Sequence, residues 1–357
     1  MKPRLEIHAD RVLHNIRALY ALAERRGVSV SIVTKGLVGY EPMLRLLREN
    51  GVASICEARI DSLKALEEAG MADCEKWLIR LPLISEASDT VRYADVSLNS
   101  ELSVVEALSR ECARQGRTHR VVVMVELGEL REGVMPEDLL SLCEAVERLP
   151  GIELYGVGAN LSCIYEIVPE ADNMAVLAEA AASVEEALGR KLSVVSGGSS
   201  SAVRMFEEGT LPGIVNHLRI GESALLGTIA CYNVPFAGAL TDNFILEAEV
   251  IEVKSKPASP WGRKVDLATG RPGRYLAPDA ENRVHALIAV GYQDTDIREA
   301  FPLDPGLRFE GLSSDCCVFD VTDMEKLPRP GDTVRFSLRY HAMLQAMVAD
   351  TVEKIIV

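Results

Sequence analysis

The chain has 357 residues, of which 48% are hydrophobic and 25% charged, a composition typical of a globular protein with one large domain or two. Its 38 basic and 53 acidic residues give a formal net charge of -15, which repels a phosphate backbone and excludes nucleic acid as an expected partner. No apolar run reaches the roughly 18 residues of a membrane span, and the opening MKPRLEIHAD lacks a secretory pattern, so we expect a cytoplasmic protein with no membrane partner.

Through about residue 235, short apolar runs alternate with amphipathic helical stretches, which is the pattern of βα units. The predicted strands are LEIHA (5–9), VSVSIVT (28–34), ASICEA (53–58), KWLIRLP (76–82), VSLN (96–99), RVVVMVEL (120–127), ELYGVGAN (153–160) and LSVVSGG (192–198). Eight such units predict an α/β fold, a (β/α)8 TIM barrel over residues 1–235. The alternative is a doubly wound open sheet, but HADRVLHNI follows the first strand where that fold usually has a glycine-rich turn.

From about residue 236 the pattern changes to strand-like runs separated by turn signals such as ASPWG, LDPG and RPGD. The runs are NFILEAEVIEVKSKP, RYLAP, RVHALIAVGY, LRFEGL, CCVFDVTD, DTVRFSLRY and TVEKIIV. They predict a C-terminal all-β domain over residues 236–357.

Eight cysteines are spread along the chain without a CxxC pair or a histidine at metal-ligand spacing, which predicts no metal site and no disulfide framework. Most of them lie in apolar runs, where a reduced thiol acts as a small hydrophobic side chain.

In a barrel, functional side chains lie where strands end at the carboxyl face. Lys35 ends the apolar run VSVSIVTK and is followed by a glycine, so its amine is expected to project into the barrel mouth, where burial favours Schiff-base chemistry. A lysine at a strand end is also a common surface charge. The assignment therefore depends on the motifs that follow.

Two later segments are candidates for holding an anion. SGGSSSA (196–202) follows a predicted strand, and its small residues allow backbone amides and the hydroxyls of Ser199 and Ser200 to converge on a phosphate. RIGES (219–223) is again centred on a glycine, and Arg219 at its start is either a surface charge or a donor to a ring nitrogen. Taken alone, each segment is equally compatible with an ordinary turn.

Together these motifs resemble the fold-type III pyridoxal-phosphate enzymes, in particular the alanine racemases and the related ornithine/lysine racemases. EIHADRVLHNIRAL resembles the opening of that family, and VTKG its cofactor-binding segment, which implies that Lys35 binds pyridoxal 5'-phosphate. VELGELREGV resembles the segment whose arginine supports the phenolic oxygen of the cofactor and the substrate, which implies this role for Arg131. RIGESALLG resembles the phosphate loop, which places Arg219 at the pyridine nitrogen and Gly221 and Glu222 at the phosphate.

The resemblance continues into the β domain. VGYQDTD resembles the stretch that carries a second catalytic base, which implies that Tyr292 acts together with Lys35. GLSSDCCVFD resembles the loop that closes over the substrate carboxylate, which nominates Ser314 and Asp315. In this family the β domain of one subunit reaches the barrel of the other, so the resemblance implies a homodimer with shared active sites.

The chain also departs from alanine racemases. Met124 stands where they have a lysine that can be carbamylated, and Asn160 stands where they have a histidine beside the pyridine ring. Gly39 occupies the place of a tyrosine, which follows one residue later, and DTVEKIIV has no counterpart of their C-terminal tyrosine. These differences favour the ornithine/lysine branch, with Asn160 still expected at the cofactor.

The resemblance therefore predicts an amino-acid racemase that acts on ornithine or lysine more readily than on alanine. Three alternatives stay open at this point: an alanine racemase, a decarboxylase of the same fold type, and a non-catalytic pyridoxal-phosphate carrier. Glu222 and the pair Cys316 and Cys317 keep the decarboxylase open, whereas the length of the β domain argues against a carrier.

Overall fold

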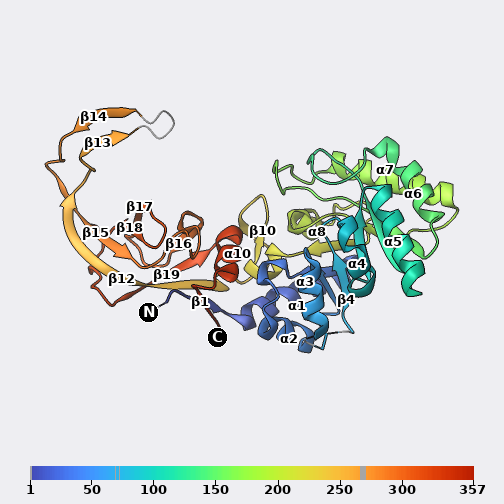
Figure 1. Ribbon diagram of the computed structural model, residues 1–357, viewed down its shortest axis with the longest axis horizontal. Helices are drawn as coiled ribbons and strands as arrows, with labels where there is room; N and C mark the ends of the chain where they lie inside the picture. The colour runs from blue at the N-terminus through green and yellow to red at the C-terminus, as the bar shows by residue number, and fades with distance from the viewer. Residues whose placement is uncertain (1, 69, 72, 266–270) are drawn as a thin grey trace. The chain divides into compact units, whose positions relative to one another are not determined.

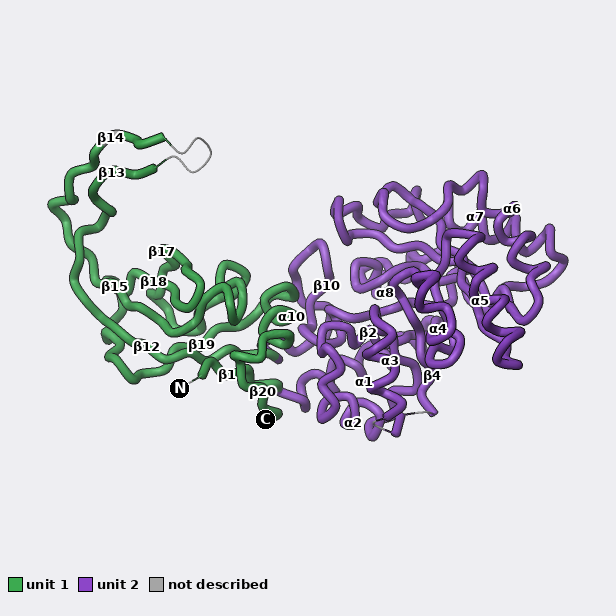
Figure 2. The backbone as a smooth tube through the Cα atoms, in the orientation of Figure 1, with its two compact units in different colours: residues 1–7, 244–357 green, residues 8–243 purple. Residues whose placement is uncertain are grey.

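A computed structural model describes residues 2–68, 70, 71, 73–265 and 271–357. The chain divides into two compact units, one formed by residues 8–243 and the other by residues 1–7 and 244–357 (Figure 2). Each unit buries its own large apolar side chains, Trp77 and Phe206 in the first and Phe319 and Phe336 in the second.

The unit of residues 8–243 is a closed barrel of eight parallel strands (Figure 1). Its strands are β2 (Ser29–Val33), β3 (Ser54–Glu57), β4 (Glu75–Leu78), β5 (Val96–Asn99), β6 (His119–Met124), β7 (Ile152–Gly158), β8 (Val194–Ser196) and β9 (His217–Ile220). Its helices are α1 (Ala9–Arg26), α2 (Glu41–Glu49), α3 (Ile60–Glu68), α4 (Ala87–Tyr93), α5 (Leu102–Gln115), α6 (Pro136–Glu147), α7 (Ala171–Leu188), α8 (Val203–Glu208) and α9 (Glu222–Leu226). The predicted (β/α)8 barrel is confirmed.

One barrel strand differs from the prediction. The run LEIHA was expected to open the barrel, but β1 (Arg4–Ile7) pairs with β12 (Phe244–Pro257) and β20 (Glu353–Ile356) in the other unit, and β9 is the eighth barrel strand. The burial of β1 alternates, which is typical of an antiparallel sheet, whereas β5 is buried along its whole length as a strand of a parallel barrel is. The prediction missed β9 because HLRI carries a histidine and an arginine, both of which the barrel buries.

The interior of the barrel is filled by side chains from most of its strands. Trp77 on β4 is fully buried, and its ring stacks on that of His217 with a centroid distance of 4.6 Å. Around it pack Val33, Cys56, Val96, Leu98, Val122, Met124 and Val194. Because this core fills the centre of the barrel, the polar side chains at the strand ends lie above closely packed apolar side chains.

The second unit is built on an antiparallel sheet with the order β16-β19-β12-β15-β18-β17, which β1 and β20 extend. The further strands are β15 (Asn282–Ile288), β16 (Ala300–Pro302), β17 (Arg308–Leu312), β18 (Cys317–Asp320) and β19 (Thr333–Leu338). The strands β13 (Gly262–Val265) and β14 (Pro272–Leu276) form a separate hairpin (Figure 1). The predicted β domain is thus a sheet, but it also contains one helix that the sequence reading did not assign, α10 (Tyr340–Val348).

The boundary between the units lies later than residue 235. A short hairpin of β10 (Thr228–Ile229) and β11 (Val234–Pro235) follows the barrel, and residues 236–243 return to α1. There the Asn15 side chain bonds to the backbone of Leu240 in both directions, at 2.8 and 2.9 Å, and Arg11 donates to the carbonyl of Asp242 at 2.8 Å. These contacts hold residues 236–243 in the barrel unit, so that the sheet unit resumes at β12.

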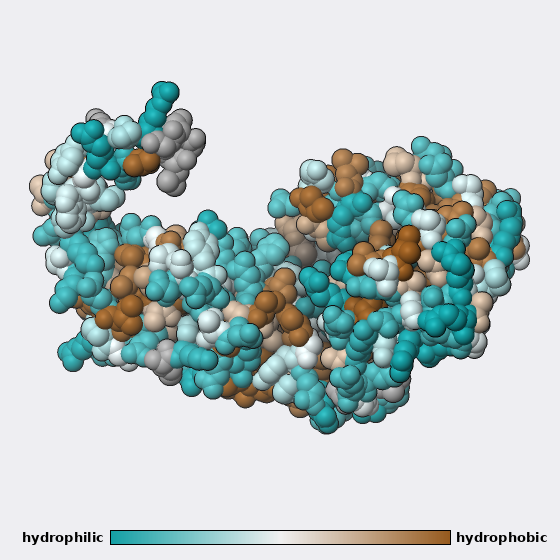
Figure 3. Space-filling model, in the orientation of Figure 1, coloured by the Kyte–Doolittle hydropathy of each residue, from teal (hydrophilic) through white to brown (hydrophobic). Residues whose placement is uncertain are grey.

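Hydrophilic residues cover most of the face shown in Figure 3, as the strong net charge leads one to expect, with smaller hydrophobic patches between them. Within the described ranges, no helix combines the length and the apolar character needed to cross a bilayer.

Candidate active site

Lys35 lies two residues after the end of β2, in the short 3-10 turn of Lys35–Leu37. The preceding Thr34 fixes this turn, because its amide donates to the carbonyl of Cys56 at 3.0 Å. Since β2 pairs in parallel with β9, and Ser31 lies opposite Arg219, Lys35 and the end of β9 lie at the same end of the barrel. The predicted lysine is thus at the barrel mouth.

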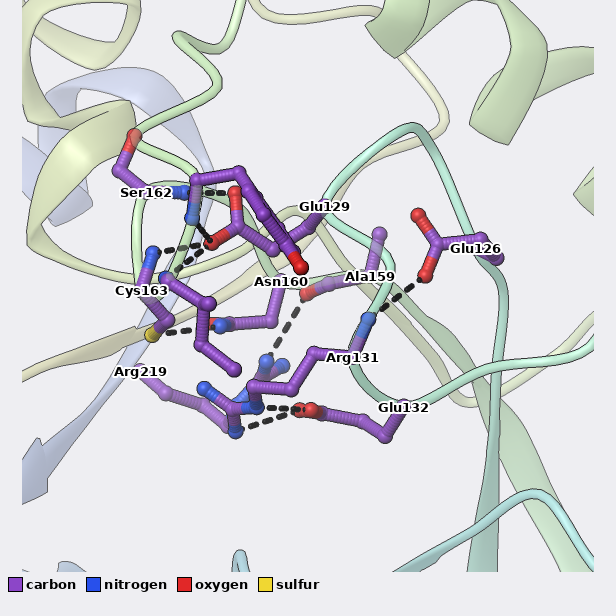
Figure 4. Close-up of polar contacts among 11 residues, drawn as sticks. Glu126, Glu129, Arg131, Glu132, Ala159, Asn160, Ser162, Cys163 and Arg219 are labelled. Atoms are coloured by element: carbon purple, nitrogen blue, oxygen red, sulfur yellow. Dashed lines mark hydrogen bonds and ion pairs between the residues drawn. The ribbon is translucent and has the colours of Figure 1, made fainter.

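Arg219 points into the barrel from β9 and is 3% exposed. Its Nη2 donates to the carbonyl of Ala159 at 2.9 Å (Figure 4), and its Nη1 donates to the hydroxyl of Ser196. Burial lowers the pKa of this guanidinium below its ordinary value. The alternative that Arg219 is a surface charge is therefore excluded by its position.

A polar chain that sequence reasoning missed lies beneath Arg219. Ser196 Oγ also bonds to His217 Nδ1 at 2.9 Å, and His217 Nε2 bonds to Ser31 Oγ at 2.8 Å. Burial, and then the charge of Arg219, lowers the pKa of His217 to about 3, so the ring is neutral and carries one N–H. The alternation of His217 and Arg219 along one strand is the signal that both side chains face the same side.

Arg131 lies in a loop whose three glutamates have different partners. Glu126 accepts the amides of Gly128 and Arg131 at 2.5 and 3.1 Å, which closes the loop on itself. Glu132 forms a two-point ion pair with the Arg131 guanidinium, with an Nη2 to Oε1 distance of 2.7 Å (Figure 4). The loop requires glycine at 133, because a Cβ there would lie 2.5 Å from the backbone nitrogen of Glu126.

The third glutamate of this loop, Glu129, forms hydrogen bonds with a neighbouring loop that follows β7. Its carboxylate is 1% exposed and accepts backbone amides from Ser162, Cys163, Ile164, Tyr165 and Ile167. Burial raises the pKa of Glu129, but the amides outweigh this effect and leave the pKa below its ordinary value. The same loop carries Asn160, whose Nδ2 donates to Cys163 Sγ at 3.0 Å (Figure 4). Asn160 directly follows Ala159, the acceptor of Arg219, and so lies at the predicted cofactor site.

The two candidate anion segments meet. Ser200 Oγ accepts the amides of Gly221 and Ser223 at 3.2 and 3.1 Å, and Ser199 Oγ lies 3.3 Å from Ser201 Oγ. The amide of Gly221, predicted to face a phosphate, is thus bonded to a hydroxyl. The side chain of Glu222 accepts the hydroxyl of Thr228 at 2.9 Å, which leaves its backbone as the part that fits the predicted role.

Tyr292, Ser314 and Asp315 form a separate group in the sheet unit. The amide of Tyr292 donates to the carbonyl of Ser313 at 3.0 Å, and Gln293 donates likewise to Ser314 at 2.9 Å. The two loops approach so closely that a Cβ at Gly291 would lie 2.4 Å from the nitrogen of Asp315.

The side chains of this group are open to solvent. Tyr292 is 54% exposed, and the Arg298 guanidinium lies over its ring at 5.6 Å from the centroid. Asp315 accepts the hydroxyl of Ser313 at 3.1 Å. The structure thus brings Tyr292, Ser314 and Asp315 together within one unit, and it brings the other predicted residues to the barrel mouth of the other unit.

Glu57, at the carboxyl end of β3, is a further group that the sequence reading missed. It is 1% exposed, and Thr34 Oγ1 donates to its carboxylate at 2.6 Å. Burial raises the pKa of Glu57 to about 7, against the opposing effects of Thr34, the amide of Ala58 and the charge of Lys35. A buried carboxyl group that titrates near neutrality therefore lies beside the predicted cofactor lysine.

Within the described ranges, no group of three His, Cys, Asp or Glu side chains is placed to hold a metal ion. The polar groups of the barrel mouth include an amine, two guanidiniums, hydroxyls and backbone amides, together with the carboxyl groups of Glu57 and Glu132. This set can bind an anionic molecule that carries a carbonyl group.

Comparison with known proteins adds independent findings. Residues 7–228 match the family model described as alanine racemase, N-terminal domain. The chain is 34% identical to an ornithine racemase from Acetoanaerobium sticklandii over 99% of each chain. It is 33% identical to a lysine racemase from Thermotoga maritima over 99% of this chain and 98% of that protein. Among solved structures, it is similar to an alanine racemase from Bartonella henselae with covalently bound pyridoxal phosphate, with a TM-score of 0.76, 17% identity and coverage of 100% of both chains.

Proposed function

The chain belongs to the alanine racemase family and is an amino-acid racemase, and on that premise we propose that it acts on a diamino acid, ornithine or lysine, in preference to alanine. The observation that carries this proposal is the similarity to an ornithine racemase and a lysine racemase over nearly the whole of all three chains. The similarity to a solved alanine racemase, at 17% identity, supports the fold alone.

The residues of the barrel mouth fit pyridoxal 5'-phosphate. Lys35 supplies an amine that can bond covalently to the carbonyl group of the cofactor. Arg219 supplies a buried hydrogen-bond donor for the ring nitrogen, and Arg131 supplies a positive charge for the phenolic oxygen. In our proposal the hydroxyls of Ser199 and Ser200 and the backbone of Glu222 donate to the phosphate, and Gly221, whose amide donates to Ser200, holds these groups together. Asn160 lies next to the acceptor of Arg219. Once bound, the cofactor draws electrons away from the α-carbon of the amino acid, so that its α-proton can be removed.

Arg219 has one further consequence for this site. A guanidinium donates hydrogen bonds and accepts none, so Arg219 can share its own proton with a ring nitrogen but does not stabilise a second proton there as a carboxylate would. Arg219 would therefore hold the ring nitrogen of a bound cofactor largely unprotonated. Such a ring would take up less negative charge, which suits an enzyme that only removes and returns one proton.

Racemisation requires one base on each face of the α-carbon. In our proposal Lys35 serves one face and Tyr292 the other. Arg131, the Ser314 hydroxyl and the backbone amide of Asp315 hold the substrate carboxylate. Tyr292 lies in the sheet unit and is exposed, so it is available to the barrel of a partner subunit in a homodimer. The protein then acts in the cytoplasm on free amino acids.

The test is a comparison of substrates. The purified enzyme is incubated separately with L-ornithine, L-lysine and L-alanine, the products are separated by chiral chromatography, and carbon dioxide is measured in parallel. We expect the D-enantiomer of ornithine or lysine without carbon dioxide. A kcat/KM for alanine about tenfold above the values for both diamino acids, a difference of about 1.4 kcal/mol in transition-state free energy, would contradict the proposal. So would release of carbon dioxide, or no turnover of any of the three.

A further inference from the structure

The ion pair between Glu132 and Arg131 differs in its burial from most other arginine–glutamate pairs of the barrel unit. The Glu132 side chain is 8% exposed and that of Arg131 33%, whereas the pair of Arg148 with Glu144 is 74% and 43% exposed. Exposed pairs contribute little, because water and salt screen them. A carboxylate as buried as that of Glu132 interacts strongly with its partner and is costly to replace.

The positive charges around Glu132 explain why a negative charge is needed at this position. Arg219 is buried in the same cluster, and its hydrogen bonds go to two neutral acceptors, the Ala159 carbonyl (Figure 4) and the Ser196 hydroxyl. Burial lowers the pKa of Arg219, the negative charge of Glu132 opposes that effect, and the positive charge of Arg131 adds to it. Two guanidiniums therefore lie in one cluster, and because Arg219 is buried, water screens their mutual repulsion less than it screens a pair on the open surface.

The other two glutamates of the loop cannot take over this role. Glu126 accepts the amides of Gly128 and Arg131, and Glu129 accepts the amides of the loop that follows β7. Met124, at the end of β6, is fully buried and carries no charge. Among Glu126, Glu129 and Glu132, it is Glu132 whose carboxylate contacts the Arg131 guanidinium.

We propose that Glu132 is a positioning residue that holds the Arg131 guanidinium inside the barrel mouth, against repulsion from Arg219, in the place where it receives the substrate carboxylate. This inference rests on the proposed function for the identity of that carboxylate. It assigns Glu132 no contact with the reacting atoms. Without the charge of Glu132, the Arg131 side chain turns toward solvent, and substrate binding weakens more than turnover does.

Three variants separate charge from volume. Glu132→Gln removes the charge and keeps the shape, Glu132→Ala removes both and leaves space for a small carboxylate, and Glu144→Ala opens an exposed ion pair as a matched control. Formate is the probe, and formamide, of similar size but uncharged, is its control. Two readouts are taken: kcat and KM for the preferred amino acid, and the Tm of each protein as purified.

We expect both Glu132 variants to raise KM at least about tenfold while kcat changes by less than about threefold. Formate, but not formamide, should restore at least half of the lost kcat/KM in Glu132→Ala and raise its Tm. It should do neither in Glu132→Gln, which has no space for it, nor in Glu144→Ala.

The proposal is wrong if KM of Glu132→Gln stays within about threefold of the wild-type value or falls below it. It is also wrong if formate affects Glu132→Ala and Glu144→Ala alike. Should no amino acid be turned over, the proposed function fails, and the Tm readout still decides whether Glu132 is the counter-ion of Arg131. A formate effect on Tm without any change in KM shows a counter-ion that does not position the substrate, and it overturns the inference.

Discussion

The hydroxyl of Thr34, the residue directly before Lys35 in the chain, donates a 2.6 Å hydrogen bond to the carboxylate of Glu57. Glu57 is 1% exposed, and its pKa is raised to about 7, mainly by burial. The lysine predicted to hold the cofactor therefore has an ionisable neighbour whose charge changes within the neutral pH range.

Glu57 should make the stability of the protein depend on pH. Its pKa is higher in the folded chain than its ordinary value of 4.5, so the folded state binds the proton more tightly, and stability is lost as pH rises from about 4.5 through 7. Glu57→Gln removes this titration. Its free energy of unfolding relative to wild type should therefore increase by about 2–3 kcal/mol between pH 5 and pH 8.

Urea unfolding at several pH values measures this difference. Glu67→Gln, on the exposed side of α3, serves as the control and should run parallel to wild type. Parallel curves for Glu57→Gln and wild type would show that Glu57 does not titrate in this range.

Lys35→Ala should abolish the covalent attachment of the cofactor, because Lys35 is the lysine that the turn after β2 places at the barrel mouth. The variant is expected to purify without visible absorbance and, after borohydride treatment, without cofactor on any peptide. Lys191→Ala, at a side chain that is 86% exposed, should behave like wild type. Mass spectrometry that finds reduced cofactor on another lysine of Lys35→Ala would refute the assignment.

Glu129→Gln should loosen the loop after β7. The carboxylate of Glu129 accepts amides from five residues of this loop, and an amide side chain offers one oxygen in place of two. We expect a loss of about 1–3 kcal/mol at pH 7, with faster hydrogen exchange at residues 162–167.

The pH dependence of this effect has the opposite sign from that of Glu57. The pKa of Glu129 lies below its ordinary value, so its contribution is present at neutral pH and is lost as pH falls below about 4.5. The difference between wild type and Glu129→Gln should shrink there. An exchange rate in this loop that is the same in both proteins at pH 7 would show that Glu129 does not hold it.

Tyr292→Phe should keep the fold and the cofactor and lose racemisation in both directions, since each direction requires one base on each face. Exchange of the α-hydrogen with deuterium from the solvent should survive for one enantiomer, the one whose proton faces Lys35. Proton NMR of each enantiomer in heavy water follows the exchange. Equal exchange of both enantiomers would remove Tyr292 from the proton transfers.

The barrel was predictable because its strands and helices leave a periodic pattern in the sequence, but the pattern does not name the partner of each strand. For this reason the sequence reading assigned LEIHA to the barrel and missed HLRI, the strand that in fact completes it. One forms a strand of the antiparallel sheet and the other completes the barrel, where two polar side chains are buried.

Some residues of the candidate site could likewise be predicted from the sequence, and others could not. Lys35 and Arg219 were accessible from the sequence, since Lys35 ends an apolar run directly before a glycine and Arg219 opens the family-like segment RIGES. Glu129 and Glu132 were not, because a glutamate in a loop is typical of a solvated surface, and Glu57 was not, because nothing in the strand that it ends indicates a partner for its carboxylate. Their partners, such as Thr34 for Glu57, are distant in sequence or become significant only through burial.

The central claim is that one active site combines Lys35 from a barrel with Tyr292 from the partner subunit. Mixing Lys35→Ala with Tyr292→Phe, each inactive alone, tests it most directly, with subunit exchange followed by native mass spectrometry. Random exchange of equal amounts makes half of the dimers mixed, each with one intact site, so racemase activity should recover to about a quarter of the wild-type value. No recovery in a mixture that has exchanged subunits would contradict the account, because Tyr292 would then act in its own subunit or take no part in the reaction.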